Sequence, residues 1–338
     1  MSNTVLVVGG AGYIGSHTCK ALARAGLDPV SFDDLSTGHA EFVKWGPLVV
    51  GNIEDSDRLD DAFRRYRPMA VLHFAARAYV GESVTDPSSY YRTNVVGTLS
   101  LLEAMRRADV KRLVLSSTCA VYGQPDTCPI TEATQPRPIN PYGATKLMAE
   151  RILADYRSAY GLSFIALRYF NACGADPDGE IGELRDPETH LIPRAIMALQ
   201  GHIDDFSVFG NDFETPDGTA VRDYIHVSDL AEAHLAAVKA VAVANRGDVY
   251  NLGTGHGISV GQVLHAVAAH AGRACPAVIG RRREGDPSRL VADPTRARQE
   301  LSFEPRYSDL DTIVGTAWAW HRRAHPARNG APSRAAAE

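Results

Sequence analysis

A tyrosine and a lysine four residues apart form the pair in this chain best suited to acid–base chemistry. Asn140 and Pro141 predict the start of a helix, with Asn140 as its N-cap, so Tyr142 and Lys146 would share one face. A nearby ammonium favours the phenolate, which predicts that Tyr142 acts as a base near neutral pH. With 13 tyrosines and 5 lysines in 338 residues, chance supplies about 0.2 such pairs, and this is the only one. The alternative is an incidental pair on a surface helix.

A glycine-rich turn near the N-terminus could hold the phosphates of a dinucleotide. Gly9, Gly12 and Gly15 follow a first apolar run and open a predicted helix in G-x-x-G-x-x-G spacing. Glycine lets the backbone approach a ligand closely, and the amides of a helix N-terminus favour a pyrophosphate. Asp33 lies about 20 residues on, where a carboxylate could accept both ribose hydroxyls, which favours NAD over its phosphorylated relative. The alternative is a structural turn with an ordinary capping aspartate.

A third group for the site should come from the end of a neighbouring strand, because ligands of open α/β sheets bind there. The apolar run 113–117 ends in Ser116, Ser117 and Thr118, and a hydroxyl at this point could bond a substrate oxygen. Serine and threonine also end many strands without any such role.

The elements that must position these residues alternate along the first half of the chain. Apolar, β-branched runs predict strands at 4–8, 29–32, 48–50, 69–74, 113–117 and 164–167, and helical periodicity lies between them at 13–25, 57–66, 91–108 and 141–160. Strands that are apolar along their length are buried on both faces. The fold class is therefore predicted as α/β: a doubly wound, Rossmann-type parallel sheet with a smaller C-terminal α/β substrate lobe.

The regular alternation of predicted strands and helices ends at about residue 172, and this change gives the expected division of the chain. We expect a dinucleotide-binding domain at 1–172 and a substrate-binding lobe at 173–325, with segments near 221–255 packing back on the first domain. In the second half, helices are predicted at 192–199, 230–244 and 260–271 and a strand at 207–209. Residues 326–338 lose periodicity and predict a disordered tail.

Composition limits the remaining classes. The net charge of −5 argues against a nucleic-acid or anionic-membrane binder, although a few arginines could still hold a small phosphate ligand. Five scattered cysteines predict reduced thiols, and the chain offers no paired metal-ligand spacing. No apolar run approaches 18 residues, and no signal-peptide pattern precedes the first strand. These features predict a cytoplasmic protein without a metal site.

The chain resembles the extended short-chain dehydrogenase/reductases, and more narrowly the UDP-glucose (UDP-galactose) 4-epimerase family, nearly to residue 320. The resemblance is carried by GGAGYIGSH at 9–17, HFAA at 73–76, VGES at 80–83, NVVGT at 94–98, SSTCAVYG at 116–123, NPYGATK at 140–146, LRYFNACGA at 167–175, VRDYIHVSDL at 221–230, NLGTG at 251–255 and RREGD at 282–286. It implies an isomerase with tightly bound NAD, a UDP-sugar substrate, a transient 4-keto sugar and a homodimer.

The same resemblance implies roles for individual residues. Tyr142 would be the base, Lys146 its electrostatic partner and Thr118 the residue that steers the 4-oxygen of the sugar. Cofactor contacts would come from Gly9, Gly12, Tyr13, Ile14, Gly15, Asp33, Asp34, Leu35, Thr37, Gly38, Asn52, Ile53, Phe74, Ala75, Ala76, Asn94, Ser116, Tyr142, Lys146 and Tyr169. Substrate contacts would come from Thr118, Asn171, His190, Leu191, Phe209, Arg222, Arg283, Asp286 and Leu290.

Some positions depart from the family pattern, and other activities stay open. Asn52 stands where the family usually has aspartate, Ala78 where a lysine is common, and Asp34 and Thr37 replace asparagines. Leu290 aligns with the gate of the sugar pocket and is intermediate in size, so UDP-N-acetylhexosamines and UDP-xylose/UDP-arabinose remain alternatives to UDP-hexoses. A nucleotide-sugar dehydratase would place Asp-Glu after Thr118, where this chain has Cys119 and Ala120. An inert NAD-sensing protein would have lost the Tyr142–Lys146 pair.

Overall fold

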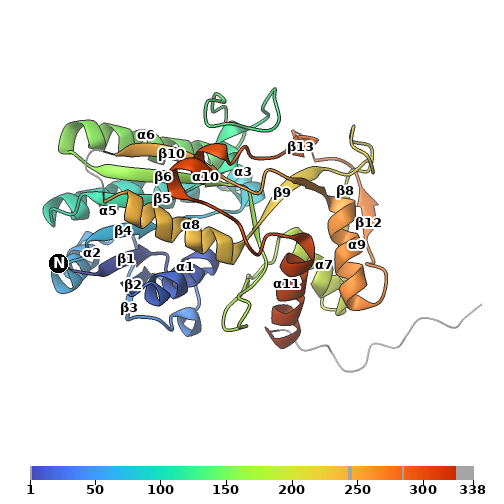
Figure 1. Ribbon diagram of the computed structural model, residues 1–338, viewed down its shortest axis with the longest axis horizontal. Coiled ribbons are helices and arrows are strands. Elements are labelled where there is room, and N and C mark those ends of the chain that lie inside the picture. Colours follow the sequence, from blue (N-terminus) through green and yellow to red (C-terminus); the bar gives the residue numbers. More distant parts are fainter. Residues whose placement is uncertain (1, 243–245, 284, 325–338) are drawn as a thin grey trace, which may run out of the picture.

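The main body of the computed structural model is a parallel sheet covered by helices on both faces (Figure 1). The structure describes residues 2–242, 246–283 and 285–324. Every neighbouring pair of strands in this sheet is parallel, which confirms the predicted doubly wound sheet. In spatial order its seven strands are β10 (Gly247–Leu252), β6 (Ser163–Tyr169), β5 (Arg112–Thr118), β4 (Ala70–His73), β1 (Thr4–Val8), β2 (Asp28–Asp33) and β3 (Leu48–Val50).

Alternate residues of the strands face two separate hydrophobic cores. In β1, Val5 and Val7 pack into one core, while Leu6 and Val8 pack into the other, as the two-residue period of a strand requires. The first core takes side chains from α1 (Tyr13–Arg24), α8 (Val227–Ala240) and α10 (Thr295–Leu301). The second takes side chains from α2 (Ser56–Tyr66), α5 (Gly97–Arg107) and α6 (Pro141–Tyr160).

The strand order reverses between β1 and β4, and this switch point fixes where a ligand can bind. On one side of it the chain runs to β2 and β3, and on the other to β5, β6 and β10. In open α/β sheets the crevice at the carboxyl ends of the strands beside a switch point is the ligand site. The glycine turn after β1 and the hydroxyl residues at the end of β5 both lie at this edge of the sheet.

A segment between β4 and α5 differs from the single helix predicted at 91–108. The short helices α3 (Val80–Thr85) and α4 (Pro87–Tyr90) lead into a π-helical stretch, η2 (Tyr91–Val96), before α5 begins. Stretches of π-helix widen a turn and are frequent at functional sites, and η2 carries Asn94. Short 3₁₀ helices η1 (Ala40–Phe42) and η3 (Cys119–Tyr122) follow β2 and β5.

The second lobe is built around β9 (Val221–His226). This strand pairs with β7 (Asn171–Cys173), β11 (Gly257–Ser259) and β13 (Arg289–Leu290), and a separate pair joins β8 (Ser207–Phe209) to β12 (Val278–Gly280). The helices of the lobe are α7 (Leu191–Leu199), α9 (Val260–Ala271) and α11 (Leu310–Ala324), which share one hydrophobic core. Strand β10 and helix α8 come from the same half of the chain but belong to the main sheet and its covering layer (Figure 1).

A long loop, residues 174–190, runs between β7 and α7 and is held against α1 by a buried lysine. Lys20 Nζ lies 2.7 Å from both Asp176 Oδ2 and Asp178 Oδ2 and 2.6 Å from Glu180 Oε2. Three carboxylates around one ammonium offset the cost of burying it. The predicted disordered tail, 326–338, lies outside the described residues, and no helix within them is long and apolar enough to cross a bilayer.

Candidate active site

Helix α6 carries the tyrosine and the lysine on a face turned into the protein. The helix begins as predicted, since Asn140 Oδ1 accepts a 2.8 Å hydrogen bond from the Gly143 amide and Pro141 occupies the first helical position. Tyr142 and Lys146 are 8% and 4% exposed. A side chain this buried is held in one place and shielded from water, which suits a proton transfer to a bound ligand.

The carboxyl end of β5 faces this pair. Lys146 Nζ donates a 2.8 Å hydrogen bond to the carbonyl oxygen of Ser116, and the side chains of Tyr142 and Thr118 share a hydrogen bond. Ser116 Oγ lies 2.5 Å from the hydroxyl of Tyr169. The structure thus brings together all five of these predicted site residues at one end of the sheet.

The pKa of Tyr142 is set mainly by its burial and not by Lys146. Desolvation raises the pKa of Tyr142 above its ordinary value, the neighbouring Tyr169 adds to this, and the hydrogen bond with Thr118 opposes it. Burial also lowers the pKa of Lys146 to about 8, while Glu150 favours its charged form. The prediction of a lowered pKa for Tyr142 is therefore wrong for the protein alone, because desolvation disfavours the phenolate.

The glycine turn forms a cradle into which no larger residue would fit. A side chain at Gly9 would place Cβ 2.5 Å from the Ala75 amide nitrogen, and one at Gly15 would place it 2.1 Å from the Gly9 carbonyl oxygen. Gly9 also has a φ of +86°, which favours glycine. Helix α1 has Gly12 as its N-cap, without a side-chain cap, and has no acidic residue in its first turn. Its free amides and positive dipole end can take a pyrophosphate.

The end of β2 provides the ribose side of this cradle. Asp33 is buried, and its two carboxylate oxygens each accept a 2.9 Å bond, from the amides of Ala11 and Leu35. The carboxylate therefore both fixes the glycine turn and keeps lone pairs for a ligand hydroxyl. Asp34 Oδ2 accepts a 2.9 Å bond from Asn52 Nδ2, so two of the departures from the family pattern pair with each other.

Other predicted cofactor residues lie at or near the same edge of the sheet, at the carboxyl ends of the strands. Asn94 is 2% exposed and bonds Thr145 of α6 as well as the backbone of Arg77, which ties η2 to the end of β4. Tyr13 donates its hydroxyl to the Gly174 carbonyl oxygen at 2.6 Å, so its ring is a structural contact and its amide the group left for a ligand. The remaining predicted residues follow β1, β2, β3 and β4: Ile14, Thr37, Gly38, Ile53, Phe74, Ala75 and Ala76. Together these residues fit a dinucleotide.

Among the predicted substrate residues of the second lobe, one arginine forms an ion pair, a second stacks on an aromatic ring, and a leucine lies beside the first. Arg222 Nη2 lies 2.5 Å from Asp286 Oδ1, and the Arg283 guanidinium lies 4.1 Å from the centre of the Phe209 ring. Leu290 stands opposite Arg222 in the β13–β9 register and packs against the cluster that includes Tyr122. Asn171, which donates to the Asp223 carbonyl oxygen, belongs to the same sheet. An arginine fork beside an aromatic face suits a nucleoside diphosphate.

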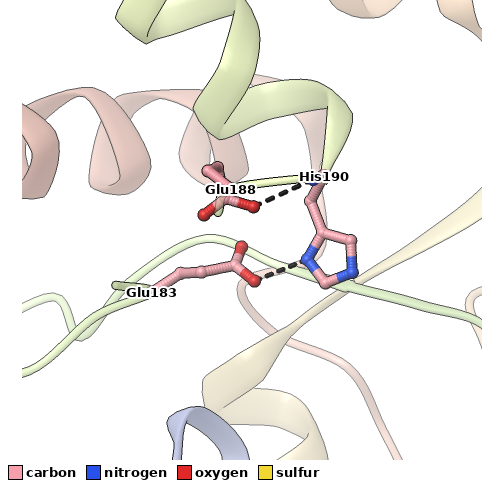
Figure 2. A group of neighbouring side chains, drawn as sticks. All are labelled: Glu183, Glu188 and His190. Carbon is pink, nitrogen blue, oxygen red and sulfur yellow. Dashed lines mark hydrogen bonds and ion pairs between the residues drawn. The ribbon is translucent and has the colours of Figure 1, made fainter. Parts of the chain in front are cut away.

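His190 lies in a cluster of charges at the start of α7 (Figure 2). Its Nδ1 is 2.5 Å from Glu183 Oε1, which also accepts a 2.9 Å bond from Arg185 Nε. Burial alone would raise the pKa of Glu183, but His190 and Arg185 hold it below its ordinary value. Glu188 accepts hydrogen bonds from the amides of Thr189 and His190, just before α7, and Leu191 follows as the first residue of this helix. The contact with the buried Glu183 fixes the Nδ1 side of the His190 ring.

The second carboxylate of this cluster gives the protein a pH-dependent stability. Burial and the neighbouring Glu183 raise the pKa of Glu188 from 4.5 to about 7, and its Oε2 has no hydrogen-bond partner among the described residues. The folded protein therefore binds more protons than the unfolded chain between pH 4.5 and 7, so ionisation of Glu188 lowers stability as pH rises through this window.

We expect Glu188→Gln to remove this penalty. Glutamine keeps the acceptor for the two amides without the charge, so the variant should gain stability at pH 8, on the order of 3 kcal/mol at most, and none at pH 4. Urea unfolding at the two pH values measures the difference, with Glu232→Gln on the exposed side of α8 as the matched control. An equal effect at both pH values would show that Glu188 is ionised at no cost.

Reasoning from the sequence missed Glu183, Arg185, Glu188 and Glu150. The first three lie in the 174–190 loop, where a run of Gly, Pro and acidic residues predicts only a solvated loop. Their burial comes from contacts of the loop with other parts of the chain, such as the bond from Trp320 Nε1 to the Glu183 carbonyl oxygen. Glu150 had a visible signal, because it stands four residues after Lys146 and eight after Tyr142 on α6.

Known proteins with this sequence pattern and fold agree with the geometry. The chain matches the model of the NAD dependent epimerase/dehydratase family over residues 5–253. It is 52% identical over 322 residues to the UDP-glucose 4-epimerase of Rhizobium meliloti (strain 1021), a match that covers 95% of this chain and 98% of that protein.

Solved structures of similar proteins extend the agreement to the whole fold. UDP-glucose 4-epimerase from Brucella ovis in complex with NAD is 55% identical, with a TM-score of 0.92 over 94% of this chain and 98% of that one. UDP-glucose-4-epimerase from Stenotrophomonas maltophila, with bound NAD and formylated UDP-arabinopyranose, is 39% identical, with a TM-score of 0.92 over 96% and 99%. The chain therefore belongs to the NAD dependent epimerase/dehydratase family and, within it, to the UDP-glucose 4-epimerases.

Proposed function

We propose that this protein catalyses the reversible, NAD-dependent 4-epimerisation of a UDP-hexose, UDP-glucose or UDP-galactose, through a transient 4-keto sugar. The observation that carries the proposal is the buried Tyr142–Lys146 pair facing Thr118 at the carboxyl end of β5, in the same crevice as the glycine cradle. A base and a dinucleotide site at one switch point are the two parts that oxidation of a hydroxyl requires.

The residues divide the reaction between them. When bound, NAD would accept the hydride of carbon 4 and return it to the other face of the keto sugar, and its positive charge would favour the phenolate of Tyr142. Tyr142 removes the proton of the 4-hydroxyl, Thr118 orients the 4-oxygen, and Lys146 supplies positive charge beside the site. After the 4-keto sugar has turned over in the pocket, Tyr142 returns the proton to the 4-oxygen. The base therefore ends each turnover as it began.

The second lobe holds the nucleotide while the sugar moves. Arg222 and Arg283 would contact the diphosphate, with Asn171, His190 and Asp286 around phosphate, ribose and uracil, and Phe209 and Leu191 as apolar neighbours. The binding energy of the UDP part keeps the 4-keto intermediate in the site, while its sugar ring stays free to turn.

Two alternatives differ in their support. A dehydratase needs an acid–base pair after Thr118, and burial raises the pKa of Cys119 there to about 12, so that this thiol stays protonated. A UDP-pentose 4-epimerase is favoured by one observation, the formylated UDP-arabinopyranose bound to the Stenotrophomonas relative. Leu290, which lies beside Arg222 in the register of β13 and β9, is the residue we expect to decide which sugars enter.

A panel of UDP-sugars tests the assignment. Purified protein without added cofactor should interconvert UDP-galactose and UDP-glucose faster than UDP-xylose and UDP-arabinose or the UDP-N-acetylhexosamines. Faster turnover of a pentose would replace the hexose assignment, and failure on every member of the panel would refute the epimerase proposal.

We also infer a homodimer and a cytoplasmic setting. Apolar side chains are exposed over the neighbouring elements α3, η2, α5 and α6, which supports a partner on this face: Val80, Val84, Val96, Leu99 and Met148. Light scattering after gel filtration would contradict the dimer by giving the mass of one chain. All five cysteines are free, which is typical of a reducing compartment.

A further inference from the structure

Three residues of α6, spaced four apart, face three consecutive residues at the end of β5. Tyr142 bonds Thr118, Lys146 bonds the Ser116 carbonyl oxygen, and Glu150 Oε1 accepts a 2.5 Å bond from Ser117 Oγ. We propose that Glu150 is a positioning residue for the reaction: paired with Arg168, it fixes α6 along β5 and keeps Lys146 in its ammonium form. The inference rests on the proposed function for its catalytic consequence, and on the contacts alone for the charge of Lys146.

The Glu150–Arg168 pair is buried and fully engaged. Both side chains are 6% exposed. Arg168 Nε donates to Glu150 Oε1 at 2.9 Å, and its Nη2 lies 2.5 Å from Oε2, which is a bidentate pair. Arg168 Nη1 also donates to the hydroxyl of Tyr122 at 2.9 Å, and that hydroxyl donates to Asn251 Oδ1 at 2.7 Å.

These contacts join three strands to one helix. Arg168 stands opposite Ser117 in the β5–β6 register, and Asn251 stands opposite Arg168 in the β6–β10 register. Glu150 is the point at which α6 enters this network. Because a helix rises about 1.5 Å per residue, even a one-residue slip of α6 along β5 would break the bidentate pair. The same slip would move the Tyr142 hydroxyl from the reacting oxygen, and errors of about 1 Å cost about 10²-fold in rate.

The charge of Glu150 has a second effect, on Lys146. The lysine donates to a carbonyl oxygen, and no carboxylate of the described residues forms an ion pair with it. Burial disfavours that charge, and Glu150, one helical turn on, favours it.

The other groups that face Lys146 are not anions. On β4, burial lowers the pKa of His73 to about 3, so this imidazole is neutral. On α6 and β6, burial raises the pKa values of Tyr142 and Tyr169, so both phenols are neutral in the protein alone. Arg168, the remaining charge, is held by Glu150 in the bidentate pair. Among the described residues, Glu150 is the group that raises the pKa of Lys146 against the effect of burial.

The shortage of lysine makes a direct test practical, because only five ε-carbons need to be resolved. The full-length protein is labelled with ¹³Cε-lysine, the Lys146 signal is assigned with Lys146→Met, and its titration is followed by NMR in Glu150→Gln. We expect the midpoint to move to lower pH by about one pH unit, a tenfold change in proton affinity. In the same variant, the pH at which kcat for UDP-galactose falls on the alkaline side should also move down by about one pH unit. KM should change little.

The matched control is Asp176→Asn, which removes the charge of another buried carboxylate, the partner of Lys20. It should move the Lys20 signal and leave that of Lys146 and the pH profile unchanged. If Glu150→Gln alone does not fold, Glu150→Gln with Arg168→Met removes the pair without leaving a bare guanidinium. The Lys146 midpoint should still move to lower pH, by less than in Glu150→Gln, because the positive charge of Arg168 is lost as well.

A Lys146 titration identical to wild type in the variant that folds would overturn the inference, and so would an equal shift in Asp176→Asn. A shifted lysine in a protein whose wild type turns over no UDP-sugar would instead refute the proposed function and leave the charge effect standing.

Discussion

Replacing Tyr142 by phenylalanine is expected to lower kcat for UDP-galactose by about 10²–10⁴-fold, the usual contribution of a positioned general base. The substitution removes one oxygen from a side chain that is 8% exposed and that bonds Thr118. Because the ring and its packing remain, the fold and the nucleotide affinity should stay close to wild type. Steady-state rates give the effect, and thermal unfolding gives the check on the fold.

Tyr160→Phe is the matched control for this prediction. Tyr160 lies on the same helix but is 52% exposed at its far end, so the same chemical change there should leave kcat unaltered. Comparable rates for Tyr142→Phe and the wild type would remove Tyr142 from its role as the base.

Lys146→Met is expected to lower kcat by about 10²–10³-fold, as the loss of one preorganised charge in an active site typically does. Methionine fills the volume of the lysine stem but carries no ammonium, so both the bond to the Ser116 carbonyl oxygen and the positive charge beside Tyr142 are lost. Lys239→Met, at an exposed position in the last turn of α8, controls for the change of residue type.

The effect of Lys146 should also appear in the dependence of the rate on pH. The pKa of Lys146 lies at about 8, so its ammonium is present below that pH and is lost above it. The wild-type rate should therefore fall above about pH 8, and Lys146→Met should show a low rate without this limb. A wild-type limb that survives in Lys146→Met would have to come from another group.

The elements closest to the chemistry could be predicted from local signals. Helix α6 runs from Pro141 to Tyr160 as expected, because Asn140 caps it, Pro141 fits its first turn and Gly161 ends it in a left-handed conformation. The sheet strands of the first half differ from their predicted runs by at most two residues at either end, since apolar runs bounded by turns define them. The glycine turn and Asp33 lie together because β1 and β2 are neighbours.

The features that the sequence concealed depend on contacts between distant segments. Strand β10 lies within 221–255, the stretch expected to pack on the first domain, but only its pairing with β6 shows that it is a strand of the main sheet. The pKa of Tyr142 follows its burial, which spacing along a helix does not reveal. Arg168 is 18 residues from Glu150, and their pairing requires α6 to lie across β6. The buried charges around His190 come from a loop whose composition is that of a solvated one.

The central claim is that carbon 4 is oxidised and then reduced inside one closed site. The hydrogen removed from carbon 4 is then the hydrogen that returns, whereas the hydroxyl proton handled by Tyr142 exchanges with water. Conversion of UDP-galactose in deuterium oxide, followed by NMR of the product, tests this directly. The proposed reaction predicts UDP-glucose with no deuterium on carbon 4. Incorporation of deuterium at carbon 4 would contradict it.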